Sequence, residues 1–185
     1  MSYKAPLSST TDYGVVRVGA GISVTDGVIS GSTGLLDYGF IYSTASQLNS
    51  AINAVNIVTF SAVGPANGVS LAGGGTEITV ADAGTYTKLF TLILSKTSGG
   101  TTSISIWLRY NGVDLPGSRQ DLELVNTLAL TFTSGNYTLD MAAGSNIQMC
   151  WSSADITMTL SSLPAAVTPT RPSGHAAKIT LTRIS

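Results

Sequence analysis

Charged side chains are scarce in this sequence: only 10% of its 185 residues are Asp, Glu, Lys or Arg, and the formal net charge is -1. The nine Lys and Arg residues form no cluster. Binding to nucleic acid or to an anionic membrane requires a concentrated positive field. The sequence therefore predicts neither nucleic acid nor membrane as a partner.

Cysteine and histidine each occur once, as Cys150 and His175. A single cysteine excludes an internal disulfide framework and a multi-Cys zinc site. A Cys-His nucleophilic pair would have to join these two residues, and a Ser-His-Asp triad would have to use His175. Cys150 lies in an alternating apolar run and His175 in a proline-flanked loop. These positions favour an ordinary thiol in or near the core and a solvated imidazole over a catalytic pair.

The ten carboxylates show no pattern typical of catalysis or metal binding. Most occupy turn positions next to Gly, Asn or Ser, where Asx side chains hydrogen-bond the local backbone: Asp26, Asp82, Asp114, Asp140 and Asp155. Asp121 and Glu123 share a strand face, but a calcium site needs more oxygen ligands than these two supply. We therefore predict a non-enzymatic protein with no metal and no cofactor. An enzyme that acts on polysaccharide is a third hypothesis, weaker than the two non-enzymatic roles described below.

Long apolar runs are also missing, since none approaches the roughly 18 residues that a membrane-spanning helix needs. The N-terminal stretch MSYKAPLSST has no apolar core after Lys4, so we expect no signal peptide. These features predict a soluble protein synthesised in a cytoplasm.

The sequence is instead rich in short β-type segments separated by turns. Ten candidate strands follow residue 56: 57–62, 77–80, 86–95, 102–110, 121–125, 127–132, 137–141, 147–152, 156–160 and 178–184. Many short strands without intervening helices indicate a sandwich or jelly roll. We predict an all-β protein with a C-terminal jelly-roll β-sandwich over residues 56–185.

Residues 1–55 are predicted to anchor this domain. The first dozen residues, rich in Ser and Thr, are typical of an extended arm. Glycine then punctuates short apolar runs up to Gly31, and Asp26-Gly27 predicts the tight turn of a β-hairpin. Such a hairpin is too small to be stable alone.

A short connector helix is predicted before residue 56. Thr44 and Gln47 have the spacing of a capping box. Leu48, Ile52 and Val55 follow at helical spacing and would form one apolar face.

The stretch SISIWLRYNGVDLPGSRQDLEL, residues 103–124, concentrates charge around one tryptophan. Strand alternation places Ile104, Ile106, Leu108 and Tyr110 on one face and Ser103, Ser105, Trp107 and Arg109 on the other. We predict a hairpin that turns at Asn111-Gly112 and is braced by Asp114. An outward Trp107 is covered by another subunit or sheet, lies under a loop, or serves as a ligand platform; we favour subunit packing.

Two stretches resemble known families. The segment YGVVRVGAGISVTDGVIS resembles glycine-punctuated elements of tailed-phage fibre and capsid decoration proteins. The region from about Gly68 onward is similar to the TNF-like or C1q-like jelly rolls of phage virion proteins, through EITVADAGTYTKLFTLIL, SISIWLRYNGVDLPGS, LDMAAGSNIQMCWSS and RPSGHAAKITLTRI. The resemblance implies a homotrimer in which each jelly roll packs against two others.

The first hypothesis is a homotrimeric capsid decoration, or cement, protein on the exterior of a phage virion, bound to the major capsid protein. The hairpin and the jelly roll are separated by fewer than 40 residues without heptads or repeats, which favours this role over a long fibre. The expected capsid contacts are Tyr3, Lys4, Pro6, Tyr13, Val15 and Arg17, and the expected trimer-packing residues are Trp107, Arg109 and Tyr110.

The alternative is a short tail or head fibre whose jelly roll binds a host receptor or a host surface glycan. It would use the exposed aromatic side chain of Trp107 or Tyr110, together with the loops NGVDLPGS and AAVTPTRPSGH.

Overall fold

A computed structural model describes residues 22–25, 28–31, 36–125 and 131–185, and the chain divides into two compact units, Met1–Leu35 and Leu36–Ser185. In the first unit, β1 (Ile22–Thr25) pairs antiparallel with β2 (Val28–Gly31). The predicted hairpin is confirmed. All six predicted capsid contacts lie outside the described residues.

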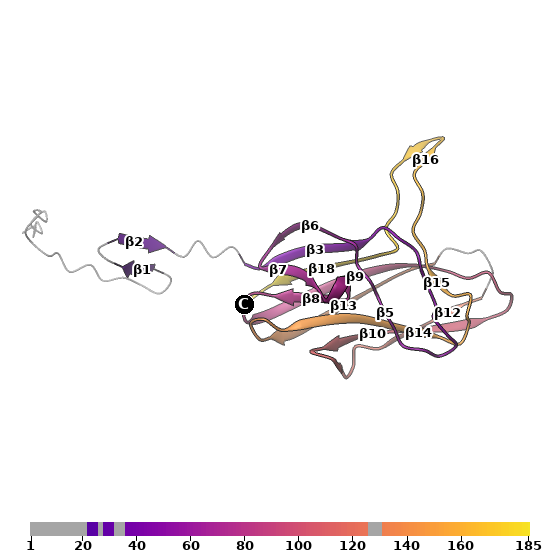
Figure 1. Ribbon diagram of the computed structural model, residues 1–185, viewed down its shortest axis with the longest axis horizontal. Helices are drawn as coiled ribbons and strands as arrows, with labels where there is room; N and C mark the ends of the chain where they lie inside the picture. Colours follow the sequence, from indigo (N-terminus) through magenta and orange to yellow (C-terminus); the bar gives the residue numbers. More distant parts are fainter. Residues whose placement is uncertain (1–21, 26–27, 32–35, 126–130) are drawn as a thin grey trace, which may run out of the picture. The chain divides into compact units, whose positions relative to one another are not determined.

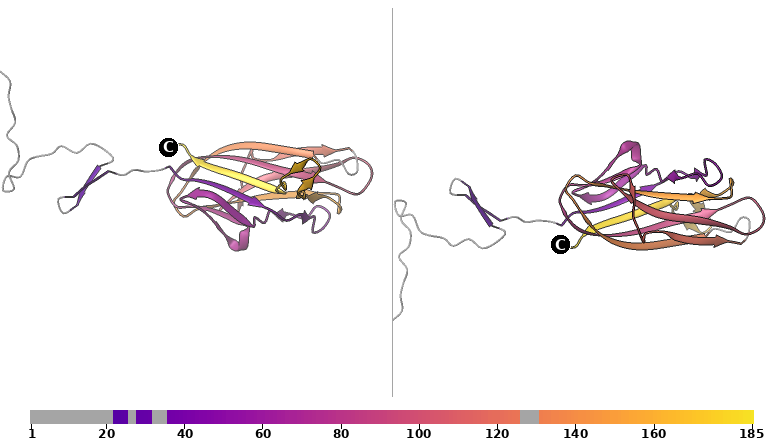
Figure 2. Two further views of the ribbon diagram at one scale, coloured as in Figure 1. Left: turned by 90° about the horizontal axis from the view of Figure 1, so that it is seen from above. Right: turned by 90° about the horizontal axis from the view of Figure 1, so that it is seen from below.

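The second unit contains two antiparallel sheets (Figure 1, Figure 2). The strands of the first sheet are β5 (Asn56–Ile57), β7 (Val69–Ala72), β8 (Glu77–Val80), β10 (Thr102–Tyr110), β11 (Val113–Asp114), β12 (Gln120–Leu124) and β14 (Asn146–Ser153). They follow the order β11-β10-β14-β8-β7, with β12 also pairing with β10 and β5 with β14. A short 3-10 helix, η1 (Gly73–Gly75), separates β7 from β8.

The second sheet joins segments from both ends of the unit. Its strands are β3 (Tyr38–Ser43), β4 (Gln47–Leu48), β6 (Ala62–Asn67), β9 (Gly84–Ser95), β13 (Thr131–Met141), β15 (Thr159–Leu160) and β18 (Ala177–Arg183). They follow the order β4-β15-β9-β18-β3-β6, with β13 also pairing with β9. Two further strands, β16 (Ala166–Val167) and β17 (Thr170–Arg171), form a separate ribbon.

The core lies between the two sheets and follows from strand alternation. On β10, Ile104, Ile106 and Leu108 are buried, while the side chains between them are partly exposed. Residues of the second sheet, such as Phe90 and Leu181, belong to the same buried cluster. The prediction of an all-β jelly roll is therefore confirmed. No helix in the described part of the chain is long and apolar enough to cross a membrane.

The predicted connector helix is wrong, because its capping residue bonds the backbone of a neighbouring segment instead. The Gln47 amide donates to the Thr59 carbonyl at 2.8 Å and accepts from the Thr59 N–H at 2.8 Å. Leu48, Ile52 and Val55 are 73%, 62% and 52% exposed, so the three residues do not form a buried apolar face.

The boundary predicted near residue 56 falls inside the second unit. The strand β3 lies before that boundary, yet it pairs with β18 over six residues and with β6. The compact unit therefore begins at Leu36.

Candidate functional site

The outward face of the first sheet brings together residues from four strands. On β10, Trp107 lies opposite Cys150 of β14, and Cys150 lies opposite Ile57 of β5. In the next row, Ser105 lies opposite Asp121 of β12 on one side and Ser152 of β14 on the other. The register thus places an aromatic ring beside hydroxyl groups and a carboxylate.

Asp114 ties Trp107 and Arg109 to the β10–β11 hairpin. The indole Nε1 of Trp107 and the Nε of Arg109 both donate to Oδ1 of Asp114, at 2.9 and 2.8 Å. The hydrogen bond from Trp107 has the largest effect and that from Arg109 the second largest. Together they hold the pKa of the Asp114 carboxyl below its usual value. Asn111 and Gly112 have φ of 46° and 81°, as a tight hairpin turn requires. The predicted hairpin and the bracing role of Asp114 agree with this geometry.

The loop after β11 forms a wall beside Trp107 and is held at two points. The Ser118 hydroxyl accepts from the Leu108 N–H at 3.0 Å and donates to the Leu115 carbonyl at 2.8 Å. The Tyr137 hydroxyl, from the second sheet, donates to the Pro116 carbonyl at 3.0 Å. These bonds fix the loop to both sheets.

On the other side of Trp107, Arg119 and Ser105 converge on Asp121. The Arg119 Nε lies 2.9 Å from Oδ1 of Asp121, and the Ser105 hydroxyl donates to the same oxygen at 2.6 Å. The Arg119 bond, followed by that of Ser105, lowers the pKa of Asp121. Both partners of this ion pair are more than half exposed, so salt screens it and its contribution to stability is small.

These elements enclose a hollow of about 420 Å³ that we call the Trp107 groove. Its lining residues are Val55, Ser105, Trp107, Asp114, Leu115, Pro116, Gly117, Arg119 and Ser152. A second hollow shares Val55 and includes Gln47, Thr59 and Trp151. A third shares Ser105 and Arg119 and includes Asp121 and Glu123. Each of the two further hollows therefore shares lining residues with the Trp107 groove.

Sequence reasoning identified part of this site. Trp107 and Arg109 are brought together by Asp114, whereas Tyr110 lies one position further along β10 and accepts a hydrogen bond from the Ala142 N–H at 3.0 Å. Val55 and Ser152 were missed as site residues. Nothing in the local sequence of either residue marks it, because only strand pairing brings both beside Ser105.

The outward side of the second sheet forms another surface, the threonine-rich face. Strand register aligns twelve outward positions on β3, β18, β9 and β13: Tyr38, Phe40, Tyr42, Thr87, Leu89, Thr91, Ser134, Asn136, Thr138, Lys178, Thr180 and Thr182. Lys178 is the only ionisable charge among these twelve, and Leu89 at its centre is 52% exposed.

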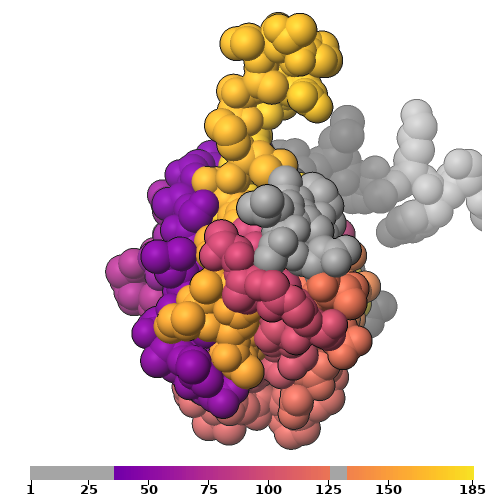
Figure 3. Space-filling model, turned by 90° about the vertical axis from the view of Figure 1, so that its right-hand side faces the viewer, coloured from indigo at the N-terminus to yellow at the C-terminus, as the bar shows by residue number. Residues whose placement is uncertain are grey.

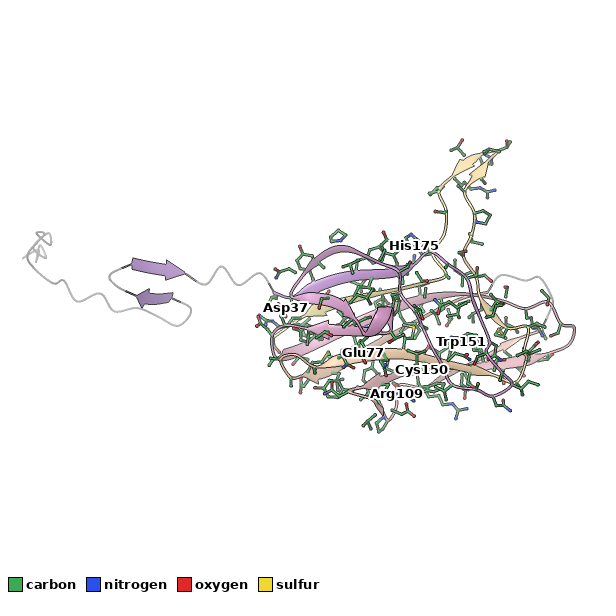
Figure 4. The ribbon with its side chains drawn as sticks, in the orientation of Figure 1. Asp37, Glu77, Arg109, Cys150, Trp151 and His175 are labelled. Atoms are coloured by element: carbon green, nitrogen blue, oxygen red, sulfur yellow. The ribbon has the colours of Figure 1, made fainter. Side chains whose placement is uncertain are left out.

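Cys150 and His175 do not form a pair. Cys150 is fully buried in β14, and burial raises the pKa of its thiol to about 11. His175 precedes β18 in the other sheet, and Figure 4 labels both His175 and Cys150. The His175 ring stacks on Tyr42, with ring centroids 4.1 Å apart. In the described ranges, no group of three or more His, Cys, Asp or Glu residues could hold a metal ion.

No family model and no curated protein matches this chain. Among solved structures, it is similar to the globular domain of zebrafish complement 1qA protein, with a TM-score of 0.49 and 10% identity over 80% of this chain and 98% of that one. It is also similar to murine APRIL, with a TM-score of 0.47 and 13% identity over 80% of this chain and 99% of that one.

Proposed function

We propose that this chain is a non-enzymatic structural protein that assembles as a homotrimer and decorates a phage capsid. Residues 1–31 would bind the major capsid protein, and the jelly roll would project from the capsid exterior. The resemblance of the glycine-rich segment to phage decoration proteins supports the capsid role. The threonine-rich face is the structural feature that best supports assembly as a homotrimer.

The threonine-rich face suits burial by identical copies because its twelve positions present hydroxyls, aromatic rings and Leu89 with one charge, while Asp140 lies in the next row of the same face. Charged residues are depleted at the cores of protein interfaces and aromatic residues are enriched. The predicted packing residues Trp107 and Arg109 lie on the other sheet, where the Trp107 Nε1 and the Arg109 Nε are already bonded to Asp114. We therefore assign subunit packing to the threonine-rich face.

Replacing Leu89 with Arg tests this assignment. Around a threefold axis the substitution places a cation in each of the three equivalent interfaces, so we expect the trimer to dissociate to monomers at about 10 µM protein. Ile52→Arg is the matched control, because Ile52 is 62% exposed and lies outside this face. Sedimentation velocity would measure the oligomeric state of both variants. A Leu89→Arg variant that stays trimeric would exclude this face as the interface.

The capsid role is tested by deleting residues 1–31 and mixing the truncated protein with undecorated shells. We expect a soluble trimer that no longer binds. Decoration of shells by the truncated protein would contradict the anchoring role. Electron microscopy of virions would separate the capsid role from the fibre alternative, since density on the tail would overturn the first.

A further inference from the structure

We propose that the Trp107 groove is a binding site for neutral saccharides, with the Trp107 ring as a platform and Ser105, Ser152 and Arg119 as hydroxyl partners. This inference does not depend on the capsid role, because it rests on the groove alone.

The lining of the groove matches the two kinds of surface that a sugar ring presents. Val55, Trp107 and Leu115 offer apolar surface to the C–H faces of a pyranose. The Ser105 hydroxyl, which donates to Asp121, can accept a hydrogen bond from a sugar hydroxyl, and the Ser152 hydroxyl can donate and accept. The volume, about 420 Å³, lies within the usual range of small-molecule sites.

Trp107 can act as a platform because its polar atom is already bonded. Its Nε1 donates to Asp114, so a ligand need not supply an acceptor for the indole N–H. The side chain is only partly exposed, which leaves part of the indole open to the groove.

The charge of the groove favours a neutral ligand over an acidic one. Asp114 is paired with Arg109 and Arg119 is paired with Asp121, so the charges at the groove cancel. The adjoining hollow contains Arg119 with Asp121 and Glu123, whose combined charge is negative. A sialic acid or phosphate group would therefore meet no net positive field. A neutral saccharide is not penalised in this way.

The site is built in advance of binding. Ser118 and Tyr137 hold the wall of the groove through Leu115 and Pro116, and Asp114 holds Trp107. Little ordering is then needed when a ligand enters. Because the neighbouring hollows share Val55 on one side and Ser105 on the other, a linear oligosaccharide can occupy more of the surface than one sugar ring.

The test is titration of the full chain with neutral oligosaccharides of glucose, mannose, galactose and N-acetylglucosamine. Isothermal titration calorimetry and tryptophan fluorescence measure the binding. A fluorescence change that disappears in the Trp107→Phe variant arises from Trp107 rather than from Trp151, which is buried but lines the adjoining hollow. We expect saturable binding with at least one neutral series and tighter binding of longer oligomers. No binding to any of the four series at about 10 mM sugar, equivalent to an affinity weaker than about 3 kcal/mol, would overturn the proposal.

Substitutions at Trp107 test whether the ligand binds in the groove. Trp107→Ala should weaken binding about tenfold through loss of the aromatic platform, whereas Trp107→Phe should retain most of it. Ile156→Ala, at an exposed apolar position outside the three hollows and outside the threonine-rich face, is the control and should bind normally. Equal affinity of the Trp107→Ala variant and the wild type would locate binding elsewhere. Tighter binding of sialyllactose than of lactose would overturn the assignment of a neutral ligand.

Discussion

Lys88 points into the apolar core, where its side chain is fully buried. Strand β9 alternates, so Lys88 occupies an inward position between Tyr86 and Phe90. Its ammonium nitrogen donates to the Tyr86 carbonyl at 3.3 Å. Burial lowers the pKa of Lys88 to about 8, and the charge of the Asp140 carboxylate acts in the opposite direction. Burial therefore destabilises the charged form of Lys88, although a pKa of about 8 leaves the side chain mostly protonated at pH 7.

Replacing Lys88 with Met should stabilise the protein by up to about 3 kcal/mol at pH 7. Between pH 8 and the unfolded-state pKa of about 10.4, the unfolded chain binds more protons than the folded one, so the penalty from Lys88 shrinks as pH rises. The advantage of the variant should be largest below pH 8 and nearly absent above pH 10.

Urea unfolding of both proteins from pH 6 to 10.5 measures this difference. The comparison cancels the contribution of Cys150, whose raised thiol pKa makes stability fall in part of the same range. A constant difference across all pH values would show that Lys88 is equally protonated in the folded and unfolded states.

Gly135 lies on β13 directly opposite Phe90, in a space with no room for a side chain. A Cβ at Gly135 would lie 2.4 Å from Cζ of Phe90 and 2.5 Å from Nε2 of Gln120. The ring and the amide would both have to move. Gly135→Ala should therefore destabilise the protein by about 1–3 kcal/mol.

Gly99→Ala is the control, because a Cβ there has no heavy atom within 4 Å and Gly99 is exposed. Its effect should stay within about 0.5 kcal/mol. Calorimetric unfolding of the two variants distinguishes them, and equal melting temperatures would show that Phe90 repacks without cost.

The elements that sequence analysis placed well have one face in the core. The strand expected at 102–110 is β10, with the same bounds. The prediction succeeded because apolar and polar residues alternate along this strand, with the apolar ones buried. The helix expected around Leu48 failed because spacing cannot show whether apolar residues are buried. The strand β3 was missed, and its main partner, β18, lies about 140 residues away. Local patterns contain no information on such pairing.

The same limit applied to the candidate site. Trp107 was expected on an outward face, and Asp114 was expected to brace the loop, because both features are local to one hairpin. The groove itself depends on Val55 of a distant segment and on Tyr137 of the other sheet. Only the folded chain brings these together.

The ribbon of β16 and β17 stands off the body of the jelly roll (Figure 1, Figure 3). Nine of the ten residues 164–173 are exposed, and Val167 is 88% exposed. At its base, Leu163 and Gly174 exchange two backbone hydrogen bonds of 2.9 Å. The ribbon thus contributes almost nothing to the core.

Replacing residues 164–173 with Asn-Gly should close a two-residue hairpin on the Leu163–Gly174 pair. We expect the melting temperature to change by less than about 3 °C, because exposed loop tips tolerate such changes. Differential scanning calorimetry measures this. A larger decrease would show that the ribbon stabilises the jelly roll through contacts with another subunit.

The whole molecule divides unevenly, into Met1–Leu35 and Leu36–Ser185, and among the side chains that the structure describes the buried apolar cluster runs from Ile41 to Leu181. The second unit also closes its own sheet, because β3 at its start pairs with β18 near its end. The two sheets that enclose the core both lie within Leu36–Ser185. This unit has the features of an independently folding domain.

A chain of residues 36–185 should therefore fold alone, with a melting temperature within about 3 °C of the full chain. It should also keep the oligomeric state of the full chain, because the threonine-rich face lies on β3, β18, β9 and β13. Calorimetry and sedimentation velocity test the two expectations separately. Stable monomers would assign assembly to residues 1–35 instead, whereas a large loss of melting temperature would show that those residues stabilise the jelly roll.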